Sequence, residues 1–232
     1  MKLPPPHDTA DSLARARAAL GSSDSVERAD AAEALAEARD ALSAPAIRAL
    51  LSDPDPISAF RAAVALSVLG DDAGVEVLVW ALDKRDLCFE ALRGLTRLAA
   101  PAALEPVQRF FARRWLHPLE RLQAAAALHV MGDASGTAHL ERCQTSTRAE
   151  ERGFALELAG ALRLPGALEL LRGVLEDERD IHRLDAARGL SLLGDARAIP
   201  VLERTARDPS DPELAALAQQ ALQEFLAEKA AD

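Results

Sequence analysis

The residue types that most often bind metals or act as nucleophiles are few in this chain and stand far apart. There are five histidines, and no two of them are four residues apart, the spacing that lets one helix face hold a metal ion. The two cysteines, Cys88 and Cys143, form no C-x-x-C pair. Both fall at or near apolar positions of the repeat described below. We therefore expect them to be small buried side chains, and we expect no metal site and no cofactor.

Nucleophile and phosphate-binding motifs do not occur either. The sequence has no Gly-x-Ser-x-Gly turn and no Gly-x-x-x-x-Gly-Lys loop, and its serines fit helix surfaces or helix caps. With no catalytic constellation to assign, the sequence predicts a protein that is not an enzyme.

The composition indicates the elements that must position any site. Hydrophobic residues make up 49% of the chain, but aromatic residues only 3%, and tyrosine is absent. Alanine and leucine, the strongest helix formers, dominate, so we expect an all-α fold. A formal net charge of −10 repels nucleic-acid phosphates. The cysteines are unpaired, the start has no apolar signal region, and no long apolar run occurs. We therefore expect a cytoplasmic protein with no membrane contact.

An internal repeat sets the architecture. One column of apolar residues recurs with successive gaps of 31, 29, 33, 31 and 31 residues, and a second column repeats the same five gaps. The first column is Leu35, Leu66, Leu95, Leu128, Ala159 and Leu190. The second is Ile47, Leu78, Val107, Leu140, Leu171 and Leu202. Two independent columns with one set of gaps predict about six repeats of ~31 residues, the third of which is irregular.

Each repeat reads as a helical hairpin. Apolar companions lie three or four residues from each column, which is the spacing of a helix stripe. Gly-Asp pairs at residues 70–71, 132–133 and 194–195 end the first helix, because glycine adopts the left-handed cap conformation readily. The predicted fold is a right-handed α-solenoid of about six helix-turn-helix repeats, with polar capping helices at both ends.

The repeat also suggests where the parts of the chain begin and end. We expect an N-terminal tail and capping helix over residues 1–23, repeats over 24–208 and a C-terminal capping helix over 209–232. The approximate repeats are 24–53, 54–84, 85–115, 116–146, 147–177 and 178–208. Polar outer helices at both ends suit one continuous domain, since interior repeats bury both flanks.

The pattern Asp55-Pro56-Ile57-x-x-x-Arg61-Ala62-Ala63-x-Ala65-Leu66-x-x-Leu69-Gly70-Asp71 resembles the bacterial HEAT-like repeat first named for phycobilin lyases. Residues 180–195 resemble it nearly as well, and the likeness covers roughly residues 24–210. The resemblance implies the fold and, because this repeat serves mainly as a scaffold, a role in binding other proteins.

Other families with related folds match less well. HEAT-repeat iron hydroxylases use His-Glu pairs, and this sequence has no His-Glu dipeptide. Alkylpurine DNA glycosylases of HEAT-like type need a basic groove and aromatic side chains, which an acidic chain with two tryptophans supplies poorly. No residue marks the chromophore handling of a phycobilin lyase. Tetratricopeptide repeats have a longer period and an aromatic signature that is missing here.

A ladder of surface residues is the first candidate binding site. A residue two positions after the second column is rotated about 200° from a buried side chain and must be exposed. Four of these six positions hold Trp80, Arg109, Arg142 and Arg204, and Arg172 stands beside a fifth. Tryptophan and arginine are the residues most enriched in binding hot spots. An ordinary solvated helix face is the other interpretation.

The irregular third repeat is the second candidate. Residues 110–118 contain three aromatic residues and two arginines, and their loop is longer than its counterparts. Phe110 and Phe111 continue the core positions, but Arg113, Arg114 and Trp115 do not, and loops often carry function.

Together these features predict a non-enzymatic scaffold. We expect it to bind a protein or peptide, possibly an acidic one, through the concave face, which we expect the second helix of each repeat to line. The alternative is an enzyme or enzyme subunit of HEAT-like type, related to the phycobilin lyases or to the alkylpurine DNA glycosylases.

Overall fold

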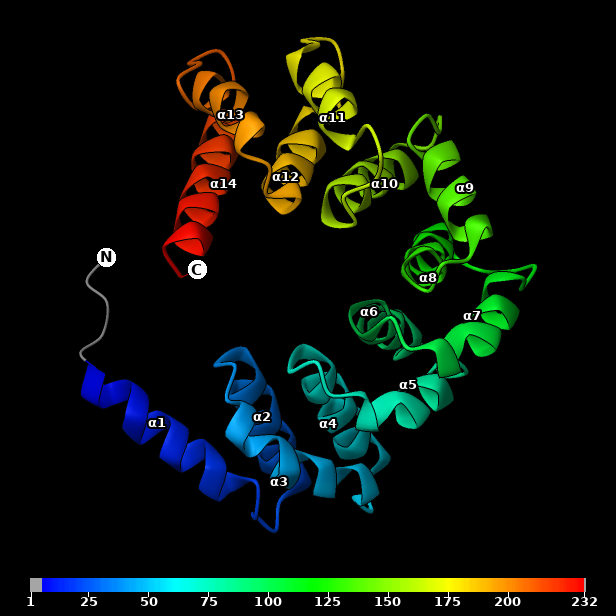
Figure 1. Ribbon diagram of the computed structural model, residues 1–232, viewed down its shortest axis with the longest axis vertical. Coiled ribbons are helices and arrows are strands. Elements are labelled where there is room, and N and C mark those ends of the chain that lie inside the picture. The colour runs from blue at the N-terminus through cyan, green and yellow to red at the C-terminus, as the bar shows by residue number, and fades with distance from the viewer. Residues whose placement is uncertain (1–5, 232) are drawn as a thin grey trace. The chain divides into compact units, whose positions relative to one another are not determined.

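The computed structural model describes residues 6–231, and it describes the surroundings of side chains for residues 11–223, 225 and 226 (Figure 1). Residues 1–5 and 232, which belong to the predicted end segments, lie outside this range. The described residues form helices joined by short turns and include no strand. None of these helices has the length and apolar character needed to cross a membrane.

The helices follow one another in a regular alternation. The first helices of the hairpins are α2 (Ser25–Glu37), α4 (Pro56–Val68), α6 (Cys88–Leu98), α8 (Pro118–Val130), α10 (Ala149–Ala161) and α12 (Arg183–Leu193). The second helices are α3 (Ala44–Ala49), α5 (Val75–Ala81), α7 (Leu104–Phe111), α9 (Ala134–Cys143), α11 (Ala167–Glu176) and α13 (Ile199–Ala206). Helices α1 (Pro6–Ala19) and α14 (Pro212–Ala231) stand at the two ends. The chain is an all-helical α-solenoid, and the proposed repeat boundaries remain a prediction.

Short 3-10 turns precede or follow several second helices. They are η1 (Ala41–Ser43), η2 (Leu50–Ser52), η3 (Asp72–Gly74), η4 (Pro101–Ala103) and η5 (Ala196–Ala198). Asp71 and Asp195 cap two of them by accepting hydrogen bonds from the backbone N–H groups of Ala73 and Arg197. The aspartate after the glycine therefore starts the second helix as the glycine ends the first.

The chain divides into two compact units. Unit 1 comprises residues 1–116 and 127–133, and unit 2 comprises residues 117–126 and 134–232, so α8 contributes to both. In unit 1 the first helices stack in order, with α2 against α4 and α4 against α6, and α1 packs on α2. In unit 2, α10 packs against α12 and α12 against α14, while α13 also packs on α14.

Both predicted core columns are buried. Every member of the first column is 0% exposed, and every member of the second is 0% or 1% exposed. Alanines fill many positions around them, especially on the first helices. Glycine allows α10 and α12 of unit 2 to approach closely: a Cβ atom on Gly160 would stand 1.9 Å from the carbonyl oxygen of Gly189. Small residues thus let the first helices approach one another closely.

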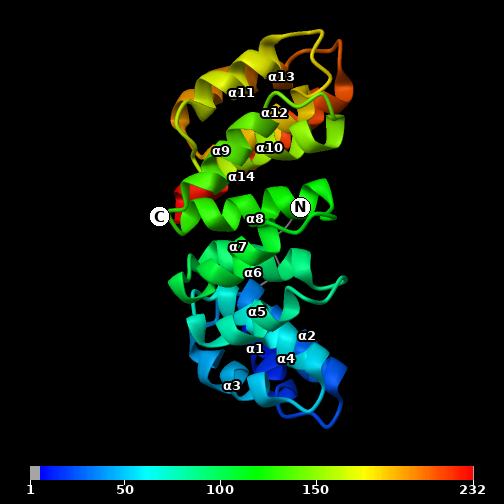
Figure 2. The same cartoon turned by 90° about the vertical axis from the view of Figure 1, so that its right-hand side faces the viewer.

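Within each unit the two kinds of helix form separate layers. In unit 1, α2, α4 and α6 lie on the inner side of the curve that the unit makes, and α3, α5 and α7 lie on its outer side (Figure 1). Figure 2, seen from the right-hand side of Figure 1, presents α5 and α7 to the viewer. In unit 2, α10, α12 and α14 are inner and α9, α11 and α13 are outer (Figure 1).

Candidate functional site

The expectation that second helices line the concave face is wrong within both units, because these helices lie on the outer side (Figure 1). The physical reason is spacing. Helices on the inside of a curve stand closer together, which favours the alanine- and glycine-rich first helices, whereas bulkier side chains fit the outside. The predicted ladder residues on α5, α7, α9, α11 and α13 are therefore carried by outer helices.

Trp80 lies on the outer helix α5 and is 42% exposed. The Nζ atom of Lys84 stands 4.8 Å from the centre of its ring, which is a cation–π contact. Lys84 follows Asp83, in the turn directly after α5. The C-terminal end of α5 thus presents an indole ring with a cation on its face.

Arg113 ties the end of α7 to the end of α5. Its guanidinium donates a hydrogen bond to the carbonyl oxygen of Leu82 at 3.1 Å and forms an ion pair with Asp83. It also lies over the ring of Phe110, 4.5 Å from the ring centre. Phe110 is buried as expected, and Phe111 is half-buried. Arg113 is therefore held by three contacts inside unit 1.

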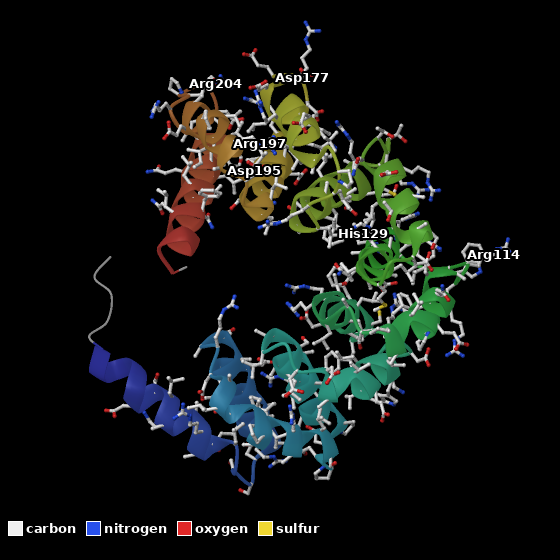
Figure 3. All side chains as sticks on the ribbon, in the orientation of Figure 1. Arg114, His129, Asp177, Asp195, Arg197 and Arg204 are labelled. Atoms are coloured by element: carbon white, nitrogen blue, oxygen red, sulfur yellow. The ribbon has the colours of Figure 1, made fainter. Side chains whose placement is uncertain are left out.

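Arg114 and Trp115 follow directly and project from the molecule. Trp115 is 87% exposed, and the Arg114 guanidinium lies 5.0 Å from the centre of its ring. Figure 3 shows Arg114 pointing outward at the end of α7. The ion pair joins Asp83 to Arg113, and each of these residues is followed directly by a cation. Lys84 follows Asp83 and lies over the ring of Trp80. Arg114 follows Arg113 and lies over the ring of Trp115. We call Trp80, Lys84, Arg114 and Trp115 the tryptophan patch.

The remaining ladder arginines have different surroundings. Arg109, on α7, is exposed and has no ion pair with any residue of the described part. Arg142, on α9, places a guanidinium nitrogen 2.5 Å from Nδ1 of His139. Arg172 and Arg204 share one carboxylate, because Glu176 lies 3.9 Å from the first and 2.5 Å from the second. Figure 3 shows Arg204 on the outer side of unit 2.

Titratable side chains converge at one point of unit 2 that the sequence analysis missed. His139 and Cys143, both on α9, are 6% and 3% exposed, and the half-buried Glu151 faces them from the first turn of α10. A search for paired histidines alone overlooks this group. The signal was the spacing of four residues between His139 and Cys143, which puts a nitrogen and a sulfur ligand on one helix face.

The electrostatic state of this cluster follows from its burial. Burial raises the pKa of the Cys143 thiol to about 11, and the neighbouring Glu151 adds to the effect. Burial, with Arg142 and Arg121 nearby, lowers the pKa of His139. A hydrogen bond from Ser146 lowers the pKa of Glu151. At neutral pH the cluster holds a neutral thiol, a neutral imidazole and a carboxylate, so Cys143 alone is a poor nucleophile.

Comparisons with known proteins agree with the repeat architecture. The family model described as HEAT repeats matches residues 137–223. No curated protein matches the sequence. Among solved structures, the complex of CpcE and CpcF of phycocyanin lyase from Nostoc sp. PCC7120 is similar, with a TM-score of 0.59 and 21% identity. That likeness covers 91% of this chain and 87% of that chain.

A second solved structure is more distant. Human deoxyhypusine hydroxylase in complex with glycerol is 18% identical, with a TM-score of 0.41, over 93% of this chain and 85% of that chain. At that score the likeness supports no conclusion, and the likeness to the phycocyanin lyase complex establishes the fold alone. The family model, the buried columns and this fold agree: the chain is a HEAT-like repeat protein.

Proposed function

We propose that this chain is a non-enzymatic scaffold that binds a protein partner, and that the tryptophan patch on unit 1 makes the central contact. The observation that carries the proposal is Trp115, a large aromatic side chain that is 87% exposed at a loop whose base Arg113 anchors. Exposing an indole to water is unfavourable, and burying one against a partner removes about 150–250 Å² of surface from water. Tryptophan is among the residues most enriched in hot spots.

The anchored base favours binding further. Arg113 is held by Leu82, Asp83 and Phe110, so the neighbouring residues start from a fixed position. A preorganised contact loses less conformational entropy when a partner binds. The cations of Lys84 and Arg114 lie on the two rings, which suits a partner with apolar side chains beside carboxylates. The proposed partner is therefore a protein or peptide with an acidic, partly apolar surface.

The arginine ladder remains a second proposed contact. Arg109 and Arg142 are exposed, whereas Arg172 and Arg204 must release the carboxylate of Glu176 before they can bind another one. That release costs part of any gain, since the new pair replaces an existing one. For this reason we place the tryptophan patch first and the ladder second.

The test compares three forms of the full chain in affinity capture from a native lysate, with quantitative mass spectrometry. The first form is wild type, and the second is Trp80→Ala with Trp115→Ala. The third is a matched control, Leu42→Ala with Ile181→Ala, which removes two other exposed large apolar side chains, 83% and 78% exposed. Support requires a protein retained by the wild type and the control and lost from the tryptophan variant.

The captured protein is then purified and its dissociation constant measured. A hot spot worth about 2 kcal/mol predicts binding that is roughly 30-fold weaker in the tryptophan variant. Equal binding by all three forms overturns the proposal that the tryptophan patch makes the central contact. A fourth form, Arg109, Arg142 and Arg204 all changed to Glu, then shows whether the ladder makes the contact instead. Circular dichroism of each form checks that helicity is unchanged.

A further inference from the structure

Three metal-ligating side chains meet in unit 2, at the junction of α9 and α10, and the proposed function does not use them. The Sγ atom of Cys143 lies 3.6 Å from Nε2 of His139 and 3.5 Å from Oε1 of Glu151. All three ligand atoms lie within 4.8 Å of one another. The cluster is separate from the tryptophan patch, which belongs to unit 1.

These separations match those around a tetrahedral metal ion. Zinc binds sulfur at about 2.3 Å, imidazole nitrogen at about 2.0–2.1 Å and carboxylate oxygen at about 2.0–2.2 Å. At tetrahedral angles these bond lengths place the sulfur about 3.5–3.7 Å from each of the other two ligands. Both distances from the sulfur in the structure fall within this range. The distance from His139 to Glu151 is within 4.8 Å, and rotation of the glutamate side chain can shorten it.

We propose that His139, Cys143 and Glu151 bind a divalent metal ion of the zinc type through Nε2, Sγ and a carboxylate oxygen. Imidazole and thiolate ligands favour zinc and cobalt over magnesium and calcium, which prefer oxygen ligands alone. One thiolate and one carboxylate balance the two positive charges of the ion. The complex is therefore neutral, which suits a site whose histidine and cysteine are almost fully buried.

Without an ion the same residues form a chain of hydrogen bonds. Arg142 donates to Nδ1 of His139, so the imidazole proton is on Nε2, facing the sulfur of Cys143. The thiol donates to one oxygen of Glu151, and the Ser146 hydroxyl donates to the other at 2.6 Å. This chain satisfies each polar group and ties α9 to α10. It is the arrangement that the ion must replace.

The replacement balances in protons and charge. The S–H bond of Cys143 breaks and its proton passes to water, while bonds form from the metal to sulfur, nitrogen and oxygen as water ligands leave the hydrated ion. His139 loses a proton from Nε2 and gains one on Nδ1, which changes its tautomer and not its charge. A protonated Nδ1 can no longer accept from Arg142, so the exposed arginine must turn towards solvent. Arg142 thus competes with the metal ion for His139.

Cobalt(II) added to the purified full chain is the probe. A tetrahedral site with a thiolate gives intense visible d–d bands and a sulfur-to-cobalt charge-transfer band. We expect both to saturate at one equivalent and to disappear when zinc is added. Cys88→Ser is the matched control, because Cys88 is the chain's other cysteine, is equally buried at 3% and belongs to unit 1. We expect this control to behave as wild type.

The ligand variants separate the contributions. Cys143→Ser is expected to lose the charge-transfer band, and Glu151→Gln to keep it while binding at least ~10-fold more weakly. Arg142→Gln is expected to bind the metal more tightly, since it removes the competing donor. If Cys143→Ser does not fold, as judged by circular dichroism, the metal affinities of Glu151→Gln and Arg142→Gln decide whether the site exists.

Three results overturn the site: no tetrahedral cobalt spectrum in the wild type, a charge-transfer band that persists in Cys143→Ser, or one that is lost in Cys88→Ser. In the first case the cluster is only the hydrogen-bonded connection between α9 and α10. These outcomes are independent of protein binding by the tryptophan patch, so the failure of one proposal leaves the other standing.

Discussion

Arginine–aspartate pairs join successive helices of this chain at the scale of single residues. Arg28 binds Asp53 at 2.7 Å in unit 1, and Arg152 binds Asp180 at 2.6 Å in unit 2. In both pairs the aspartate lies in the loop that leads from one hairpin to the next, and both residues are largely buried. Such pairs fix the position of one hairpin on the next, and removing one partner leaves the other poorly satisfied.

A third pair, between Arg17 and Asp40, predicts a specific pH dependence. Hydrogen bonds from Arg17, followed by one from Ser43, lower the pKa of the Asp40 carboxyl from 3.8 to about 2. Because folding lowers this pKa, the pair makes its full contribution to stability at pH values above the ordinary pKa of 3.8. The contribution is lost as the pH falls through the folded-state pKa of about 2. Asp40→Asn is therefore expected to lower the free energy of unfolding at neutral pH and to lose this deficit in strong acid.

Urea unfolding at a series of pH values measures this difference. Asp86→Asn is the control, because Asp86 is exposed and has no ion pair with a described residue. We expect the control to track wild type throughout. A deficit in Asp40→Asn that stays constant from neutral pH to pH ~2 contradicts the assignment.

At the scale of elements, one backbone position repeats in every hairpin turn. Residues with positive φ follow each of the six first helices, and their gaps are those of the apolar columns. They are Arg39, Gly70, Ala99, Gly132, Arg163 and Gly194. Three turns therefore place a residue with a Cβ atom in the left-handed conformation, which costs about 1–2 kcal/mol. The repeat imposes the turn even where the sequence lacks glycine.

Ala99 and Gly70 test this position in unit 1. Ala99 has a φ of 47°, so Ala99→Gly is expected to raise the free energy of unfolding by about 0.5–1 kcal/mol, after allowance for glycine's entropy in the unfolded chain. Gly70 has a φ of 75°, and a Cβ atom added to it would have no other atom within 4 Å. Gly70→Ala is therefore expected to lose about 1 kcal/mol through backbone strain alone.

Chemical denaturation of the two variants checks the opposite signs. Ala102→Gly serves as a control, because Ala102 is an exposed residue of the 3-10 turn η4 without positive φ. It is expected to destabilise the chain slightly. Stabilisation by Ala102→Gly, or loss of stability in Ala99→Gly, contradicts the explanation.

At the scale of the whole molecule, charge decides which partners can approach. The net charge is −10. On the inner side of unit 1 a groove of about 330 Å³ is lined by residues of α2, α4 and α6. Its arginines are neutralised locally: Arg61 binds Asp30 and Glu33 at 2.6 Å, and Arg97 lies 3.6 Å from Glu90. Carboxylates therefore already neutralise the two arginines of this groove, which leaves no free cation among its described residues for a phosphate backbone.

We therefore expect no binding to nucleic acid. Fluorescence anisotropy of labelled duplex and single-stranded DNA should stay unchanged when the chain is added at low salt, where electrostatic attraction is strongest. Binding that weakens steeply as salt rises would instead favour the glycosylase-like alternative. An unchanged anisotropy excludes the glycosylase-like alternative and leaves the scaffold and the lyase-like alternative.

The sequence by itself determined the helices, their order and their core. The columns that contain Leu66 and Leu78 recur every 29 to 33 residues because every hairpin buries the same positions, and the linear sequence alone shows this recurrence. The positive φ of Ala99 could have been predicted from the same gaps, although an alanine by itself gives no indication of a left-handed conformation. Tertiary structure decided which layer is inner, since curvature depends on how closely alanine-rich helices approach.

Tertiary structure also decided what each polar residue does. Arg113 and Arg204 look alike in sequence, yet one anchors a loop and the other shares a carboxylate with Arg172. The partners come from neighbouring hairpins, so no spacing within one helix reveals them. For the same reason His139 and Cys143 could be paired from their spacing, whereas Glu151 joins them only when α10 packs on α9. Periodicity specifies a repeating backbone, but contacts between repeats give its side chains their functions.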